Sequence, residues 1–327
     1  MNFRKLLYVA ALILAAAGCK KDEETEVSPS LDGRLMIEGL DEFAVPGQTF
    51  ELKAKGVTHP DNSKIGYYWK ILPSKPNADT TDVYRFTVTD TLKTCNVYCY
   101  AFAEGYSNSS AVLSYTVIKS GPDGSIQGVD YGENPGTITL TGQSPIYYRQ
   151  IGNQTWTLNN MSAGNGLAFR NAEAMADVFG RYYNFQEAHN ACELLKDATG
   201  ENWCLPTHED WKTLESYIDE NKSDSFGNSF AAALMADASF NDTDMLEYWP
   251  AVGDVLNGTH FSALPVGFAN TESGSFIGEF EYVTFWTSDS INETEAKYVY
   301  IICDQPQMQT GKGYKSSFGA SVRCILK

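Results

Sequence analysis

Apolar and polar residues alternate with a period of two over much of the first third of the chain. Between Arg34 and Lys119 the alternating runs are short and are separated by turn residues such as Pro46-Gly47 and Glu104-Gly105. This spacing is typical of a β-sandwich of about seven strands. The runs cover residues 35–37, 50–54, 65–72, 83–88, 95–103 and 111–118. We therefore expect an all-β sandwich over residues 34–119, with the Trp69 side chain buried inside it.

The second half of the chain changes to a helical period. Asn184 and Glu187 form a capping-box pattern ahead of an apolar helical face, and Gly200 is a stop signal. Thr207 and Asp210 repeat this pattern for a second helix. Strand-like runs lie at 138–140, 146–156, 283–287, 298–303 and 321–326, and a short helix is expected at 230–236 within the irregular stretch 221–260. We expect an α+β domain over residues 137–327, after a linker rich in Gly and Pro at 120–136.

The N-terminus has the architecture of a signal peptide. Arg4 and Lys5 precede a run of twelve mostly apolar residues from Leu6 to Ala17, which is too short to span a bilayer. The small residues just before Cys19 match a lipobox, so residues 1–18 are expected to be cleaved and Cys19 to carry lipid. A multi-chain lipid anchor would hold the protein stably on a membrane. The alternative is an ordinary secretory peptide in which Cys19 is incidental.

Residues 19–33 are predicted to form a flexible tether, because the chain becomes abruptly polar after the apolar run. The run from Lys20 to Glu24 resembles the lysine-plus-acid export signal of Bacteroidetes-type surface lipoproteins. That resemblance implies an outer-membrane protein facing the cell exterior. The alternative is a tether that is merely well solvated.

The chain is strongly acidic, with 41 acidic and 24 basic residues and a formal net charge of −17. Cleavage would remove Arg4 and Lys5 but no acidic residue, so the mature chain would carry −19. This charge makes nucleic acid an unsuitable partner.

Six cysteines remain besides Cys19, and an oxidising compartment favours disulfides among them. Cys95 and Cys99 lie four residues apart in a predicted strand, about 13 Å by strand geometry, which is too far for a disulfide. We expect these two to behave as small buried apolar residues. The other four allow three pairings: Cys192, Cys204, Cys303 and Cys324.

Five ordered motifs in the second domain resemble the Fibrobacter succinogenes major paralogous domain family. They are residues 151–156, the Trp-Cys-Leu-Pro-Thr string at 203–207 with Glu209 and Trp211, residues 261–267, the Phe-Trp-Thr-Ser string at 285–288, and the Ser-Val-Arg-Cys string at 321–324. The resemblance implies a C-type-lectin-like fold and a disulfide between Cys192 and Cys324, which leaves Cys204 for Cys303. Such a bridge would stabilise the fold by up to roughly 4 to 5 kcal/mol. Similarly, residues 34–119 resemble bacterial immunoglobulin-like domains, although without their disulfide pattern.

Candidate ligand-binding residues gather in the irregular stretch. Tyr248 and Trp249 could form an exposed aromatic contact, which suits both sugars and protein partners. The acidic side chains nearby are Asp237, Asp242, Asp244 and Glu247. They could hold calcium, but the calcium-sugar motifs of C-type lectins are not matched: Gln305-Pro306-Gln307 lacks the carboxylate, and Phe240-Asn241-Asp242 precedes it. We therefore predict no cofactor and treat these acidic residues as part of a solvated loop.

We interpret the chain as a non-catalytic surface lipoprotein that displays a lectin-like domain to a glycan or a protein. One alternative is a structural or fimbria-associated subunit that would assemble through a strand edge of the sandwich. Another is an enzyme of the formylglycine-generating type, which shares the fold superfamily, but its closing Arg-Gly-Gly-Ser-Trp and Gly-Phe-Arg patterns are absent. The four histidines are scattered, and no paired carboxylates stand out as a catalytic set.

Overall fold

The computed structural model describes the chain from Ser28 onward, apart from short gaps. The described residues are 28–72, 81–89, 94–118, 126–127, 129–236, 239–240, 255–302 and 305–327, with the backbone alone for 126–127 and 239–240. Cys19 and the predicted signal peptide lie outside them. None of the helices in the described part has the length and apolar character needed to cross a bilayer.

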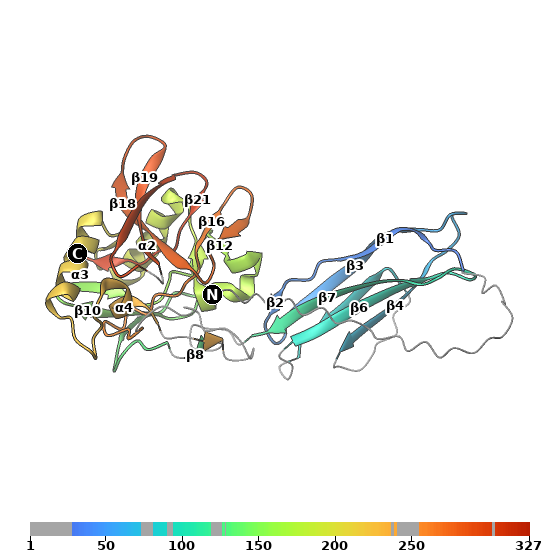
Figure 1. Ribbon diagram of the computed structural model, residues 1–327, viewed down its shortest axis with the longest axis horizontal. Coiled ribbons are helices and arrows are strands. Elements are labelled where there is room, and N and C mark those ends of the chain that lie inside the picture. Colours follow the sequence, from blue (N-terminus) through green and yellow to red (C-terminus); the bar gives the residue numbers. More distant parts are fainter. Residues whose placement is uncertain are drawn as a thin grey trace, which may run out of the picture.

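The first domain consists of two β-sheets that face each other around one core (Figure 1). One sheet has the order β1 (Asp32–Glu38), β3 (Thr49–Thr58) and β5 (Val83–Thr87). The other has the order β2 (Phe43–Ala44), β7 (Ser109–Val117), β6 (Thr94–Phe102) and β4 (Gly66–Leu72). Each of the six alternating runs coincides with a strand, which confirms the predicted β-rich sandwich. The short strand β2 was not predicted.

Trp69 is buried at the centre of this core, as predicted. Its ring stacks on Tyr84 with centroids 5.7 Å apart, and its indole N–H donates to the Thr81 carbonyl oxygen at 2.9 Å. Cys95 and Cys99 are also fully buried, and both are free thiols. Burial raises the pKa of the Cys99 thiol to about 12. These cysteines therefore pack as small apolar side chains, as the strand spacing predicts.

The end of the predicted tether belongs to the sandwich. The Pro29 and Ser28 carbonyl oxygens accept hydrogen bonds from the Ser107 N–H and hydroxyl, at 2.7 and 3.0 Å. Leu31 is only 4% exposed and joins the core. Residues 28–33 are therefore structured despite their polar composition, because two apolar side chains, those of Leu31 and Leu35, anchor the entry of β1.

The second domain contains both predicted capped helices. The helices are α1 (Ala176–Phe179), α2 (Phe185–Thr199), α3 (His208–Glu220) and α4 (Phe230–Leu234), with the 3-10 turns η1 (Phe169–Asn171) and η2 (Glu173–Met175). The Asn184–Glu187 pair caps α2 reciprocally, and the Thr207–Asp210 pair does the same for α3. Gly200 ends α2 with a φ of 74°. Local side-chain chemistry thus determined where these helices begin and end.

The second domain also contains several small β-sheets. The largest has the order β14 (Trp203–Cys204), β22 (Ile325–Leu326), β11 (Gln154–Thr157), β10 (Ile146–Ile151) and β9 (Gly136–Ile138). Two three-stranded sheets follow the orders β18 (Tyr282–Ser290), β19 (Glu295–Ile302), β20 (Gln309–Tyr314) and β17 (Ser275–Ile277), β16 (Phe268–Asn270), β21 (Phe318–Gly319). The two-stranded pairs are β12 (Leu167–Ala168) with β13 (Arg181–Tyr182) and β8 (Ile126–Gln127) with β15 (Ser239–Phe240). Helices and sheets therefore coexist in this domain, although most of the described chain is strand or loop.

The cysteines of the second domain form one disulfide among the described residues. Cys192 in α2 is bonded to Cys324, with Cα atoms 5.7 Å apart, which confirms that pairing. The predicted disulfide between Cys204 and Cys303 is wrong, because Cys204 is a free thiol. Cys303 itself lies outside the described residues. Cys204 pairs with Ile325 across β14 and β22, and its half-buried side chain lies near the Lys327 and Asp210 charges. Burial raises the pKa of this thiol.

The two domains meet end to end at the β2 and β7 end of the sandwich (Figure 1). Ile118, which follows β7, is 1% exposed and packs into the core of the second domain. The Arg170 guanidinium donates to Glu42 at 2.7 Å and to Glu279 at 2.9 Å, so that one cation links the domains. An apolar contact and an ion pair therefore orient the second domain on the first.

Candidate functional site

The predicted ligand-binding residues fall in a part of the chain that the structure does not describe. Asp242, Asp244, Glu247, Tyr248 and Trp249, together with Asp237, lie outside the described residues. Their proposed role stays a prediction. The described part offers a different candidate.

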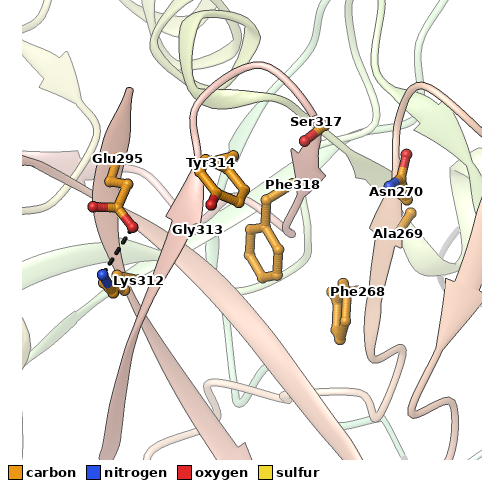
Figure 2. Close-up of a pocket in the computed structure, with 9 residues that line it drawn as sticks. All are labelled: Phe268, Ala269, Asn270, Glu295, Lys312, Gly313, Tyr314, Ser317 and Phe318. Carbon is orange, nitrogen blue, oxygen red and sulfur yellow. Dashed lines mark ion pairs between the residues drawn. The ribbon is translucent and has the colours of Figure 1, made fainter. Parts of the chain in front are cut away.

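A pocket of about 370 Å³ opens between two of the small sheets. One wall comes from β16 and β21, and the other comes from β19 and β20 (Figure 2). Figure 2 shows Glu295 and Lys312 on one side, Phe268 and Asn270 on the other, and Phe318 between them. The lining residues are Phe268, Ala269, Asn270, Glu295, Lys312, Gly313, Tyr314, Ser317 and Phe318. This volume lies within the range of small-ligand sites.

Aromatic rings form the base of this pocket. The Phe268 and Phe318 rings have centroids 4.8 Å apart and planes 28° apart. Phe318 also stacks on Tyr298 at 4.5 Å, with the planes only 14° apart, and contacts Trp286 edge to face at 5.3 Å. Such offset and edge-to-face contacts stabilise a rigid aromatic surface.

Two glycines in β20 make room for these rings. A Cβ at Gly313 would lie 2.7 Å from the Phe318 ring, and a Cβ at Gly311 would lie 2.4 Å from the Tyr298 ring. Both distances are shorter than van der Waals contact. The Phe318 and Tyr298 rings therefore cover the backbone of β20 directly, a known way of stabilising a strand that contains glycine.

The rim of the pocket is polar and charged. Glu295 and Lys312 form an ion pair of 2.9 Å, and Glu295 also accepts from the Asn292 amide at 2.9 Å. These contacts lower the pKa of Glu295, and the contact with Glu295 raises the pKa of Lys312. Tyr314, beside this pair, is 63% exposed. The pocket thus offers ring faces, a hydroxyl, a carboxylate and an ammonium group within one opening.

Hydrogen bonds fix the loop that closes the pocket on the β16 side. The Asn270 side-chain oxygen accepts from the backbone N–H groups of Glu272 and Ser273 at 3.0 and 2.9 Å. The Thr271 N–H donates to the Ser317 carbonyl oxygen at 2.8 Å. The Asn270 and Ser317 walls are therefore held together before any ligand arrives.

The sequence did not predict this pocket, because its lining comes from four strands and two of them, β16 and β21, are very short. Neither β16 nor β21 has a readable alternating pattern at two or three residues of length. The alternation of glycines at 311 and 313 within a strand was the available signal, since it marks close approach of other groups to the backbone.

The motifs that the sequence singles out meet elsewhere, in the core. Trp156 and Trp211 have ring centroids 4.9 Å apart, and Phe261 and Phe285 have centroids 5.8 Å apart. Trp211 stacks on Phe285 at 5.3 Å, which joins the two pairs. All four rings are buried, so four of the five motifs contribute to packing. These four residues are packing residues of the second domain.

Other candidate chemistry is dispersed in the described part of the chain. No group of three or more His, Cys, Asp or Glu side chains there could hold a metal ion. In the Gln305-Pro306-Gln307 string, the Pro306 carbonyl oxygen accepts from the Ala231 N–H at 3.2 Å. His59 packs on Tyr106 at 4.6 Å, and His189 packs on Phe185 at 4.8 Å. These two histidines are packing residues.

The family model of the Fibrobacter succinogenes major domain matches residues 148–326. The match begins in β10 and ends in β22, which both pair with β11, so its two ends lie in one sheet. A search of the curated proteins found no match to the chain. The matched residues make up more than half of the 327, and the chain therefore belongs to the Fibrobacter succinogenes major domain family.

Proposed function

We propose that this protein is a non-catalytic surface lipoprotein that binds a glycan through the second domain. The observation that carries the proposal is the aromatic pocket between β16, β19, β20 and β21. Its volume suits one or two sugar rings rather than a protein surface. We assign the role of recognising the end of a glycan chain to this pocket.

The chemistry of the lining supports a sugar. The exposed ring of Tyr314 can stack on the carbon-bearing face of a sugar ring, which is apolar, while the edges of the Phe268 and Phe318 rings line the same opening. Glu295 and Lys312 can accept and donate hydrogen bonds to ring hydroxyls, and charge-assisted bonds of this kind are the stronger ones. Because the pocket is held by hydrogen bonds within the protein, little ordering would accompany binding.

The rest of the chain fits a display role in this proposal. We propose that the β-sandwich is an immunoglobulin-like stalk and that the second domain has a C-type-lectin-like fold. The disulfide between α2 and the segment before β22 supports the latter assignment. We further propose that residues 1–18 are cleaved and that lipidated Cys19 anchors the protein in the outer membrane, facing the exterior.

Binding to a glycan array tests the proposed ligand class. The mature chain would carry Cys19→Ser, so that it stays free of lipid, and would be compared with its Tyr314→Ala and Lys312→Ala variants. Lys212→Ala, on the exposed face of α3, is the matched control. We expect binding to at least one array glycan, with a loss on changing Tyr314 or Lys312 and no loss on changing Lys212. Binding that survives both pocket variants but is lost in Trp249→Ala would move the site to residues 241–254.

Metabolic labelling with a palmitate analogue tests the anchor. Label should enter the full-length protein and be lost in Cys19→Ala. Protease treatment of intact cells should then degrade the protein if it faces outward. Label that persists in the variant, or a protein that is protected on intact cells, would contradict the anchor or the orientation, respectively.

A further inference from the structure

The outer face of the β2-β7-β6-β4 sheet carries a row of aromatic side chains. Strand pairing places Tyr68 opposite Tyr100, Lys70 opposite Tyr98, and Tyr98 opposite Val112. Alternation along the strands directs the odd-numbered residues of β4 and β6 inward, where Trp69, Cys99 and most of the others are buried. We call the outward surface formed by Tyr68, Lys70, Tyr98, Tyr100, Phe102 and Val112 the tyrosine face.

The rings of this face are regularly spaced. Tyr98 and Tyr100 have centroids 6.4 Å apart and planes only 8° apart, and Tyr68 lies 6.2 Å from Tyr100. Phe102 extends the row over Gly66, where a Cβ would come within 2.5 Å of the Phe102 ring. The ring therefore lies against the backbone of β4. The result is a continuous aromatic surface across two strands.

The polar side chains on the same outward face carry no negative charge. The Ser114 hydroxyl donates to the Asn96 side-chain oxygen at 2.7 Å, and the Lys70 ammonium lies 6.0 Å from the centre of the Tyr98 ring. Val112 is 53% and Phe102 is 42% exposed. No outward position of β4, β6 or β7 holds Asp or Glu, although the chain has a net charge of −17.

The opposite outer face of the same domain has an ordinary solvated composition. There Glu51 contacts Arg85 and Lys53, and Lys55 pairs with Glu38 at 2.6 Å. The outer faces of the two sheets thus differ sharply in how many charged side chains they carry. Soluble proteins rarely expose a large contiguous apolar patch that has no binding role, so the tyrosine face is a candidate binding surface.

We propose that the tyrosine face is a second glycan-binding site, which takes the interior of an uncharged polysaccharide chain. Tyrosine supplies a ring for stacking and a hydroxyl for hydrogen bonding, and three tyrosine rings at 6.2 and 6.4 Å from one another offer an extended chain several contacts in succession. An uncharged partner is favoured because the face has a single ammonium group and no carboxylate, while the remaining protein would repel a polyanion. This site is independent of the pocket in the second domain.

Affinity electrophoresis tests the site with the mature chain carrying Cys19→Ser. Native gels would contain soluble xyloglucan, hydroxyethylcellulose or amylopectin, and migration would be compared with that in polymer-free gels. We expect retardation by at least one polymer and a loss of affinity of roughly tenfold or more in the Tyr68→Ala/Tyr100→Ala variant. Val112→Asp, at an exposed position, should weaken binding as well without removing a core side chain.

The matched control is Lys53→Ala/Arg85→Ala on the opposite face, which should migrate like the parent relative to the polymer-free gel. Tyr314→Ala should leave this retardation unchanged, which separates the site from the proposed pocket function. Absence of retardation by all three polymers would overturn the proposal, as would equal retardation of the parent and both face variants. A dimer in sedimentation velocity that disappears in Tyr68→Ala/Tyr100→Ala would overturn it too, since a second copy of the chain would then occupy the face.

Discussion

The guanidinium of Arg323 lies 4.4 Å from the centroid of the Phe261 ring, and it is buried. It donates to the carbonyl oxygens of Phe261 and Ser262 at 2.7 and 3.1 Å, and to the Asn160 side-chain oxygen at 2.8 Å. Burial lowers the pKa of Arg323 to about 9. A buried cation thus joins the last sequence motif to the third, and its hydrogen bonds are what make its burial tolerable.

Replacing Arg323 should therefore strongly destabilise the second domain. Arg323→Met would leave buried carbonyl oxygens without donors, and we expect the free energy of unfolding to fall by about 3 kcal/mol or more. Arg323→Lys should restore little of this stability, because an ammonium group cannot reproduce the planar set of N–H donors of a guanidinium. Urea denaturation of both variants measures the loss. Arg85→Met, at an exposed ion pair, is the control and should change stability by less than about 1 kcal/mol.

The pairing of the cysteines leads to a prediction about stability and thiol reactivity. Loss of the Cys192–Cys324 bridge in Cys192→Ser/Cys324→Ser should lower stability by roughly 4 kcal/mol, because the bridge closes a long loop. Cys204→Ser should have a small effect, since that thiol is free and half-buried. Alkylation of the unreduced, denatured chain followed by mass spectrometry should label Cys95, Cys99 and Cys204. A peptide in which Cys204 is disulfide-bonded would contradict the structure.

The free energy of unfolding should fall at acidic pH, because the Asp210 carboxylate becomes protonated there. Burial tends to raise the pKa of this carboxyl, but its contacts with Lys327 and Thr207 outweigh burial and hold the pKa below its usual value. A carboxyl whose pKa is lower in the folded state adds stability above its unfolded pKa of about 3.9, and that stability is lost as the pH falls through the folded pKa. Asp210→Asn should flatten this part of the stability profile and weaken the cap of α3 by about 1 kcal/mol at neutral pH. The denaturation midpoint, measured at a series of pH values from neutral to acidic, checks the prediction. If the midpoint of Asp210→Asn falls with decreasing pH as steeply as that of the parent, the prediction is wrong.

Gly313→Ala should distort the pocket. The added Cβ would collide with the Phe318 ring, so the ring must move, and overpacking of this kind costs about 1–3 kcal/mol. We expect a lower melting temperature together with weaker binding of any array glycan that the parent binds. Gln309→Ala, in the same strand but outside the pocket lining, is the matched control. Full binding by Gly313→Ala would show that Phe318 is not part of the recognition surface.

Much of the architecture followed from the sequence. The alternating runs predicted six strands of the sandwich, and the capping pairs Asn184–Glu187 and Thr207–Asp210 predicted where α2 and α3 begin. These features are local, since a cap involves residues three positions apart and a strand pattern repeats every two. The motifs predicted the family and the Cys192–Cys324 bridge. By contrast, residues 28–33 looked like a tether because their anchoring contacts, with Ser107 among them, are distant in sequence.

The sequence by itself determined the strand and helix periodicity, the family, and the acidic character of the chain. Only the tertiary structure decided which aromatic residues face outward together. Phe268 and Phe318 are fifty positions apart, and Tyr68 and Tyr100 are thirty-two apart, yet each pair lies within a ring contact. The physical reason is that strand register and sheet packing bring such residues together, and these depend on pairing between distant segments that no local pattern specifies.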